Sequence, residues 1–321
     1  MTKPHVDPEF AREVLEGLSA ENKRLSSKYF YDEKGSRLFQ QIMNLEEYYP
    51  TDCEYEIFET HKEQLFRLFA SGTKNLCIVE FGAGDGKKTK VLLRHFVNKP
   101  IEFEYRPIDI SKDAVNGLVN NLADELPELE VKGVVNEYFK GLKALKEDCD
   151  WRKVVMFLGS NIGNFNDGLV KRFLDSVREN LTPNDLFLIG FDLKKDPAVI
   201  KSAYNDSKGI TAEFNLNLLD RINREMYANF NRANFVHAPE YNETTGEARS
   251  YIKSLVEQEV EIKHLNQSFK FKAGELIHTE ISRKYSLEQI AQLAAASGFE
   301  VVNNFTDSRN YFVDSVWKPK G

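Results

Sequence analysis

The chain has 321 residues, of which 41% are hydrophobic and 29% charged, with a formal net charge of −7. This composition is ordinary for a globular protein, and the negative charge argues against a nucleic-acid partner, because phosphate binding requires clustered lysine and arginine. No apolar run reaches the ~20 residues that a membrane helix needs, and the N-terminus lacks the apolar core of a secretory signal. The cysteines Cys53, Cys77 and Cys149 are few and widely spaced, which favours a reducing cytoplasm over a disulfide framework or a zinc site.

The first 70 residues predict helices around an aromatic segment. Helices are expected over residues 7–18, 36–45 and 51–70. Between them, Lys34-Gly35 predicts a turn, and Pro50 is expected to break the chain.

A glycine-rich turn then joins a short apolar strand at 76–79 to a helix at 87–96. Gly82, Gly84 and Gly86 have G-x-G-x-G spacing, and Glu80 precedes them by two residues. Neither the dinucleotide pattern G-x-G-x-x-G nor the Walker pattern fits. Glycines let the backbone approach a ligand, and a helix N-terminus supplies free N–H groups. The turn resembles the first motif of S-adenosylmethionine (SAM)-dependent methyltransferases, although a tight turn without a ligand remains an alternative.

A second strand is expected over residues 101–110, with Asp109 near its end. This position is about twenty residues past the glycines, where open α/β folds place a carboxylate that binds ribose hydroxyls. Asp109 could instead cap the helix that begins near Ser111. The sequence favours ribose binding and leaves the cap as the alternative.

Strands and helices continue to alternate, which predicts a doubly wound, Rossmann-like, mainly parallel α/β sheet. Further strands are expected at 131–135, 154–158 and 186–193, with a helix at 167–181. After Pro197 the pattern changes to helices over 198–226 and β-segments over 249–264 and 268–282, followed by a helix at 286–297 and strands at 299–305 and 311–317. We therefore expect a SAM-binding methyltransferase domain of residues 61–196 plus 286–321, and a second α+β substrate-binding domain of residues 7–60 plus 197–285.

Polar residues outside the glycine turn are further candidates for chemistry. The loop FLGSNIGNF at 157–165 follows the fourth strand, where open α/β sheets bind ligands, although a plain turn would have similar residues. Glu137 and Tyr138 follow the third strand, where an acid and a ring could meet an adenine base. Glu280 and Ser282 alternate along one face of a strand. The six histidines are scattered, and no metal site is expected.

Several segments together resemble the SAM-dependent histidine Nα-methyltransferases of ergothioneine biosynthesis: FYDEKGSRLF…EEYYPT, IVEFGAGDGKKT, FLGSNIGNF, AYND…AEFN and AGELIHTEIS. The resemblance runs from about Lys28 to the C-terminus. It implies a two-domain fold, SAM as the cofactor, and L-histidine as a substrate that is trimethylated on its α-amine to hercynine. A monomer is compatible with the sequence, which does not determine the oligomeric state.

The resemblance also implies roles for individual residues. SAM would contact Gly82, Lys88 and Asp109, beside Glu80 and Gly84 of the same motif, and Glu137 with Tyr138 fall at the adenine position, where family members commonly have Asp-Phe. The imidazole would be held by Tyr48, Glu280 and Ser282, the α-amine and carboxylate by Asn164 and Tyr204, with Tyr31 and Phe39 as aromatics near the amine. Asn164 and Tyr31 are the expected catalytic residues. One departure is Ser250-Tyr251, where family members can carry Met-Trp.

These roles are chemically reasonable for methyl transfer from a sulfonium, which depends largely on positioning and requires no nucleophilic side chain. Asn164 can orient a neutral amine, and aromatic faces suit a quaternary ammonium product. Glu280 opposite an imidazole would reject apolar rings. Two alternatives remain: a methyltransferase of the same fold acting on another amino acid or imidazole compound, which would lose the Tyr48–Glu280 pair, and a SAM-binding regulatory module without turnover, which the many polar site residues disfavour.

Overall fold

The computed structural model describes residues 6–136 and 150–321, which fold into two compact units. Unit 1 comprises Met1–Tyr49 and Lys195–Ser282, and unit 2 comprises Pro50–Lys194 and Arg283–Gly321. The expected first boundary, at residue 60, differs from this division, because Pro50 and the residues after it belong to unit 2. None of the described helices is long and apolar enough to span a bilayer.

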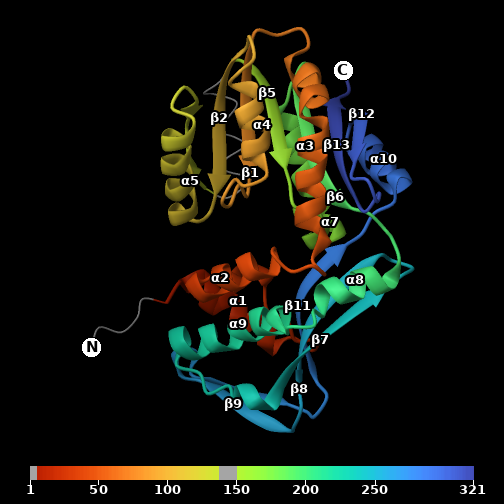
Figure 1. Cartoon of the computed structure of the whole chain (residues 1–321). Helices are drawn as coiled ribbons and strands as arrows, with labels where there is room; N and C mark the ends of the chain where they lie inside the picture. Colours follow the sequence, from red (N-terminus) through yellow and green to blue (C-terminus); the bar gives the residue numbers. More distant parts are fainter. Residues whose placement is uncertain (1–5, 137–149) are drawn as a thin grey trace. The chain divides into compact units, whose positions relative to one another are not determined.

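Unit 2 is built on a twisted, mainly parallel sheet (Figure 1). The strand order is β12-β13-β6-β5-β1-β2-β3, with β4 also pairing with β2. β1, β2, β3, β4, β5 and β6 pair in parallel, whereas β13 and β12 join antiparallel at one edge. The strands are β1 (Asn75–Phe81), β2 (Glu102–Asp109), β3 (Glu130–Val131), β4 (Val134–Val135), β5 (Arg152–Phe157), β6 (Leu186–Asp192), β12 (Phe299–Thr306) and β13 (Phe312–Pro319). The predicted doubly wound α/β fold is confirmed.

Helices cover both faces of this sheet. They are α3 (Tyr49–Ala70), which begins at the last residue of unit 1, α4 (Thr89–Phe96), α5 (Lys112–Glu125), α7 (Asp167–Asn180) and α10 (Leu287–Ala296). Figure 1 shows α3 and α4 over one face. The other face shares a core with α7 and α10, in which alternate strand residues such as Val79, Val155 and Phe187 pack against Phe173 and Ile290. This two-sided burial explains why the central strands read as continuous apolar runs.

The strand order reverses between β1 and β5, because β2 and β3 lie beyond β1 whereas β6 lies beyond β5. In open α/β sheets such a switch point leaves a crevice at the carboxyl ends of the strands, where ligands bind. The loops after β1 and β5 therefore border the expected ligand site.

Unit 1 is an α+β fold with its own apolar core. Its helices are α1 (Pro8–Ser19), α2 (Glu33–Ile42), α8 (Pro197–Tyr204) and α9 (Ile210–Met226). Its strands are β7 (Phe235–Asn242), β8 (Glu247–Ser254), β9 (Gln258–Ile262), β10 (Gln267–Phe271) and β11 (Leu276–Arg283), ordered β11-β8-β7 in one sheet and β10-β9 in the other. The core combines both segments, since Phe10 and Phe30 cluster with Phe214, Ile252 and Ile277.

Several local expectations were wrong. Lys34 and Gly35 lie inside α2, because Asp32 caps that helix and its carboxylate accepts from the Gly35 amide at 2.7 Å. Pro50 lies in the first turn of α3, where its missing N–H removes no helical bond. The strand expected over 131–135 is two short pairings, β3 and β4, and β7 was not anticipated.

Candidate active site

The turn after β1 depends on its glycines. Gly82, Gly84 and Gly86 have φ angles of 67°, 54° and 66°, in the left-handed region that glycine adopts readily. A Cβ on Gly86 would lie 2.5 Å from Leu118 Cδ1, so this glycine allows close packing against α5. A Cβ on Gly84 would meet nothing within 4 Å, so this backbone faces open space. The turn therefore offers an accessible backbone at the switch point.

Asp109, at the end of β2, faces this turn. Its carboxylate accepts from the Ser111 amide at 2.9 Å and from the Gly84 amide at 3.4 Å. Ser111, rather than Asp109, is the N-cap of α5, since Ser111 Oγ accepts from the Ala114 amide at 3.2 Å. The alternative that Asp109 caps the helix is therefore wrong. Asp109 is a partly exposed carboxylate beside the glycine turn.

Glu80, near the end of β1, is a buried carboxyl with 3% exposure. Its Oε2 accepts from the Tyr105 hydroxyl at 2.5 Å. Burial raises the pKa of Glu80 to about 7, although the hydrogen bond from Tyr105 lowers it in part. This carboxyl therefore holds its proton to a higher pH than an exposed glutamate does.

Lys88 follows the glycine turn and is held by Glu54 of α3. Lys88 Nζ donates to Glu54 Oε2, and the Glu54 carboxylate also accepts from the Gly159 amide, at 2.8 Å to Oε1 and 3.1 Å to Oε2. Burial alone lowers the pKa of Lys88, but the charge of Glu54 outweighs it and raises that pKa above its ordinary value. Lys88 is therefore a cation, and Glu54 connects the loops after β1 and β5.

The loop after β5 carries Asn164 as the last residue of the 3₁₀ helix Asn161–Asn164. Gly159 and Ser160 both have positive φ, 72° and 57°, which turns the chain sharply at the strand end. A Cβ on Gly163 would lie 2.7 Å from the carbonyl oxygen of Arg283, so glycine is needed for this close approach. Backbone geometry thus fixes the position of Asn164.

A buried ion pair supports the same loop. Lys284 Nζ and Asp192 Oδ2 are 2.7 Å apart, and each side chain is 1% exposed. The Asp192 amide donates to Ser160 Oγ at 3.0 Å. Breaking such a pair leaves an uncompensated buried charge, which typically costs about 3–5 kcal/mol. The end of β6 is therefore joined firmly to the turn that precedes Asn164.

Within unit 1, the sequence-predicted aromatics form a cluster with one further ring. Tyr31 is 46% exposed and makes edge contacts with Phe39 at 5.5 Å and with Phe214 of α9 at 5.6 Å, measured between ring centroids. Phe39 also lies 6.3 Å from Tyr48 and 5.8 Å from Phe214. We call Tyr31, Phe39, Tyr48 and Phe214 the aromatic cluster. It brings together three residues that the sequence placed in the site.

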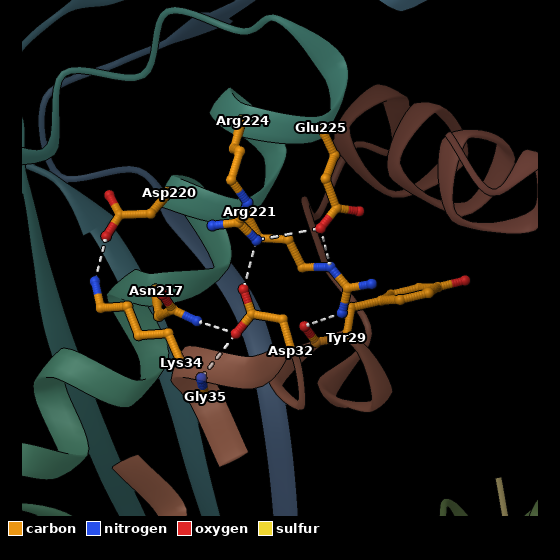
Figure 2. Close-up of polar contacts among 9 residues, drawn as sticks. All are labelled: Tyr29, Asp32, Lys34, Gly35, Asn217, Asp220, Arg221, Arg224 and Glu225. Atoms are coloured by element: carbon orange, nitrogen blue, oxygen red, sulfur yellow. Dashed lines mark hydrogen bonds and ion pairs between the residues drawn. The ribbon is translucent and has the colours of Figure 1, made fainter. Parts of the chain in front are cut away.

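A polar network holds the segment that carries Tyr31 and Phe39 (Figure 2). Asp32 Oδ1 accepts from Asn217 Nδ2 at 2.8 Å as well as from the Gly35 amide, and Oδ2 accepts from Arg224 Nη2 at 2.6 Å. Lys34 Nζ donates to Asp220 Oδ2 at 3.0 Å in the same region. These contacts fix the start of α2 against α9, and so fix the rings beside it.

The remaining substrate candidates lie on other elements of unit 1. Tyr204 is the last residue of α8, and Glu280 and Ser282 lie in β11, the former partly exposed and the latter 5% exposed. Thr279 Oγ1 donates to Asn215 Oδ1 at 2.8 Å, which ties β11 to α9 next to Glu280. Asn164, in contrast, belongs to unit 2. The adenine candidates Glu137 and Tyr138 lie outside the described residues.

The residues of unit 2 fit a bound SAM. The open backbone at Gly84, the accessible carboxylate of Asp109 and the cation of Lys88 match its adenosine and amino-acid groups in polarity. Within residues 6–136 and 150–321, no cluster of three or more His, Cys, Asp and Glu side chains is arranged to bind a metal ion.

Two residues were missed by sequence reasoning, Glu54 and Phe214. Glu54 occupies an inward position on a helix that was correctly expected, but helical spacing alone does not reveal that a glutamate points into the sheet. Phe214 lies in the AEFN segment, whose aromatic ring was a signal that could have found it.

Known proteins are similar to this chain over most of its length. A family model described as "Histidine-specific methyltransferase, SAM-dependent" matches residues 10–319. The chain is 33% identical over 301 residues to a histidine N-alpha-methyltransferase of Mycolicibacterium smegmatis, which covers 94% of this chain and 92% of the relative. It is 28% identical to ergothioneine biosynthesis protein 1 of Schizosaccharomyces pombe, across 92% of this chain and 39% of that one. The structure of mitomycin 7-O-methyltransferase MmcR has a similar fold, with a TM-score of 0.51 at 12% identity, covering 98% of this chain and 69% of that one. The chain therefore belongs to the family of SAM-dependent, histidine-specific methyltransferases.

Proposed function

We propose that this enzyme transfers three methyl groups in succession from SAM to the α-amine of L-histidine, which gives hercynine. The aromatic cluster carries the proposal within this chain. Tyr31 is exposed at its edge, and Phe39 and Phe214 lie within 6 Å of it. Each methylation adds bulk and the last fixes a positive charge, and a quaternary ammonium binds well over aromatic faces. The names of the bacterial and yeast relatives support the same reaction.

The cofactor half of the reaction is assigned to unit 2. When bound, SAM supplies an electrophilic methyl group on a sulfonium, so this chain has only to bind and orient its reactants. Asp109 would accept hydrogen bonds from the ribose hydroxyls, and the turn at Gly82 and Gly84 would lie against the amino-acid part. Glu137 and Tyr138 stay the proposed adenine contacts.

The histidine half is assigned mainly to unit 1. Tyr48, Glu280 and Ser282 would hold the imidazole, because a carboxylate and two hydroxyls can pair with both ring nitrogens. Tyr204 and Asn164 would bind the α-carboxylate and the α-amine. A neutral amide such as Asn164 orients the amine lone pair without retaining its proton, which can leave through the Tyr31 hydroxyl or to water.

We also propose that the enzyme works in the cytoplasm, in a pathway that consumes hercynine. Cys53 and Cys77 support a reducing compartment, since both are thiols outside any disulfide and both are buried.

Product analysis with a panel of acceptors tests the reaction. The protein is incubated with SAM and each of the twenty amino acids, and the products are identified by mass spectrometry. We expect mono-, di- and trimethylated histidine in time order, with fragmentation placing every methyl group on the α-nitrogen. Preferred methylation of tryptophan, or of an imidazole nitrogen, would contradict the proposal.

A single substitution tests the imidazole assignment. Glu280→Ala removes the charged acceptor, which is worth about 1.5–3 kcal/mol, so kcat/KM for histidine should fall by about tenfold to a hundredfold. SAM affinity, measured by calorimetry, should stay at the wild-type value. Glu259→Ala, an exposed glutamate of β9, is the matched control and should behave as wild type. Wild-type kcat/KM in Glu280→Ala would place the imidazole elsewhere.

A further inference from the structure

A buried charged cluster lies in unit 2 beside the glycine turn, formed by Glu54 of α3, Lys88 and Asp314 of β13. The Glu54 side chain is fully buried and accepts from Lys88 Nζ and from the Gly159 amide. A carboxylate is rarely buried to this degree unless it is paired and hydrogen-bonded. Both of its partners lie on the loops that border the switch point. Glu54 therefore holds those two loops together, although its side chain is buried.

The sheet is shaped to admit this carboxylate. A Cβ on Gly190 of β6 would lie 2.3 Å from Glu54 Oε1, so a side chain there would displace Glu54. Gly190 is the direct partner of Asp314 in the β6–β13 register. Glu54 therefore approaches the sheet where a glycine leaves room, next to a second carboxyl group.

Asp314 is the unusual member of the cluster. The residue has no exposed surface, and neither carboxyl oxygen has a hydrogen-bond donor among the described residues. Burial raises the pKa of Asp314 well above its ordinary range, and the nearby charge of Glu54 raises it further. Asp314 therefore favours its neutral form beside Glu54. The pair then carries one negative charge, which balances Lys88.

Lys88 retains binding capacity beyond Glu54. Its ammonium has three N–H donors, and Glu54 accounts for one. Its side chain is 21% exposed, and Nζ would lie 3.5 Å from a Cβ on Gly159. The cation is therefore held between the two loops that border the switch point. SAM carries a single anionic group, the carboxylate of its methionine part, and a lysine cation in this position suits that group.

We infer that Glu54 is a positioning residue for cofactor binding: it fixes Lys88 Nζ and the Gly159 loop so that Lys88 receives the carboxylate of SAM. The inference rests on SAM as the cofactor and not on histidine as the methyl acceptor. Binding can be measured without any acceptor, so a failure of the histidine proposal would leave this test intact.

The test compares SAM with decarboxylated SAM, which lacks the α-carboxylate, by calorimetry on the full chain. Glu54→Gln and Lys88→Met should each weaken SAM binding by about tenfold or more. The affinity for decarboxylated SAM should change by less than about threefold. The double variant should bind SAM no more weakly than Lys88→Met alone, because Glu54 acts through Lys88. Glu59→Gln, an exposed glutamate on the same helix that pairs with Lys62 at 2.6 Å, should bind both ligands as wild type.

Two results would overturn the inference. One is wild-type SAM affinity in Glu54→Gln, and the other is an equal loss for both ligands, which would mean a purely structural role. If Glu54→Gln does not fold, Glu54→Asp replaces it, since this change keeps the charge and shortens the side chain by one methylene. It should still weaken the binding of SAM more than that of decarboxylated SAM. An equal loss for both ligands would count against the inference in the same way.

Discussion

Glu80 is a buried carboxyl that accepts a hydrogen bond from the Tyr105 hydroxyl, and its burial makes its charge depend on pH near neutrality. Burial raises its pKa to about 7, whereas its pKa in the unfolded chain should be about 4.3. The folded state therefore binds the proton more tightly than the unfolded state. By linkage, the contribution of Glu80 to stability is greatest below the unfolded pKa and is lost as the pH rises through the folded pKa.

Glu80→Gln should remove this dependence. Between about pH 5 and pH 8, the free energy of unfolding of the wild type should fall by about 2–3 kcal/mol relative to that of the variant. The measurement is urea denaturation without SAM at several pH values. Glu102→Gln, an exposed glutamate at the start of β2, controls for the loss of a glutamate elsewhere. Parallel pH profiles for wild type and Glu80→Gln would show that Glu80 is charged throughout.

Single residues were predictable where they occur at a fixed spacing from a strand along the chain. Gly82, Gly84 and Asp109 follow strands at fixed spacing, so a pattern in the sequence identifies them and the structure places them together. Glu54 lies 34 residues before Lys88, and only the packing of α3 on the sheet brings the two together. A contact of this kind has no local signature in the sequence.

At the level of elements, two of the errors came from reading glycine and proline as breakers. Gly35 is required for a different reason, since a Cβ there would lie 1.7 Å from the carbonyl oxygen of Phe30. Its position in the first turn of α2 also lets its amide donate to the Asp32 cap. Composition cannot distinguish a glycine needed for close approach from one needed for a turn, so the helix was placed three residues too late.

The Asp32 network in Figure 2 gives the element-scale prediction. Burial raises the pKa of Asp32, but hydrogen bonds from the Gly35 amide, Arg224 and Asn217 outweigh it and lower that pKa below its ordinary value. Asp32→Ala removes a helix cap and leaves the buried Asn217 side-chain amide without its acceptor. The free energy of unfolding should therefore fall by about 2–3 kcal/mol at neutral pH. Denaturation by urea measures this change.

The stability that Asp32 contributes should also depend on pH, with the opposite sign to the contribution of Glu80. Because the folded pKa of Asp32 is depressed, its contribution is present above the unfolded pKa and is lost as the pH falls through the folded pKa. The gap between wild type and Asp32→Ala should narrow in acid. Glu33, next to Asp32, is 86% exposed and pairs with Arg37 on the surface. Glu33→Ala should therefore change stability by less than about 0.5 kcal/mol. An Asp32→Ala protein as stable as Glu33→Ala would show that the network does not hold α2.

Across the whole molecule, the chain passes between its units at Tyr49, Lys194 and Ser282. The change of pattern after Pro197 predicts an insertion, and the strands β7 to β11 pair in two sheets apart from the main one. The exact boundaries were harder, because α3 begins at Tyr49 and β11 runs across Ser282 to Arg283. Helical and strand periodicity continue through these points, so no local feature of the sequence marks them.

If the two units have the proposed roles, their ligands should stabilise different parts of the chain. A ligand suppresses local opening mainly in the segments that it contacts, and amide hydrogen exchange measures such opening. SAM alone should protect peptides that cover the glycine turn and Asp109 in unit 2. L-Histidine, added to the SAM complex without time for turnover, should protect peptides that cover Tyr48 and β11 in unit 1. L-Phenylalanine should give no such protection, since its ring offers no N–H donor to the Glu280 carboxylate. Protection by histidine confined to unit 2 would mean that the substrate is bound by the sheet unit alone, and the role of unit 1 would have to be reassigned.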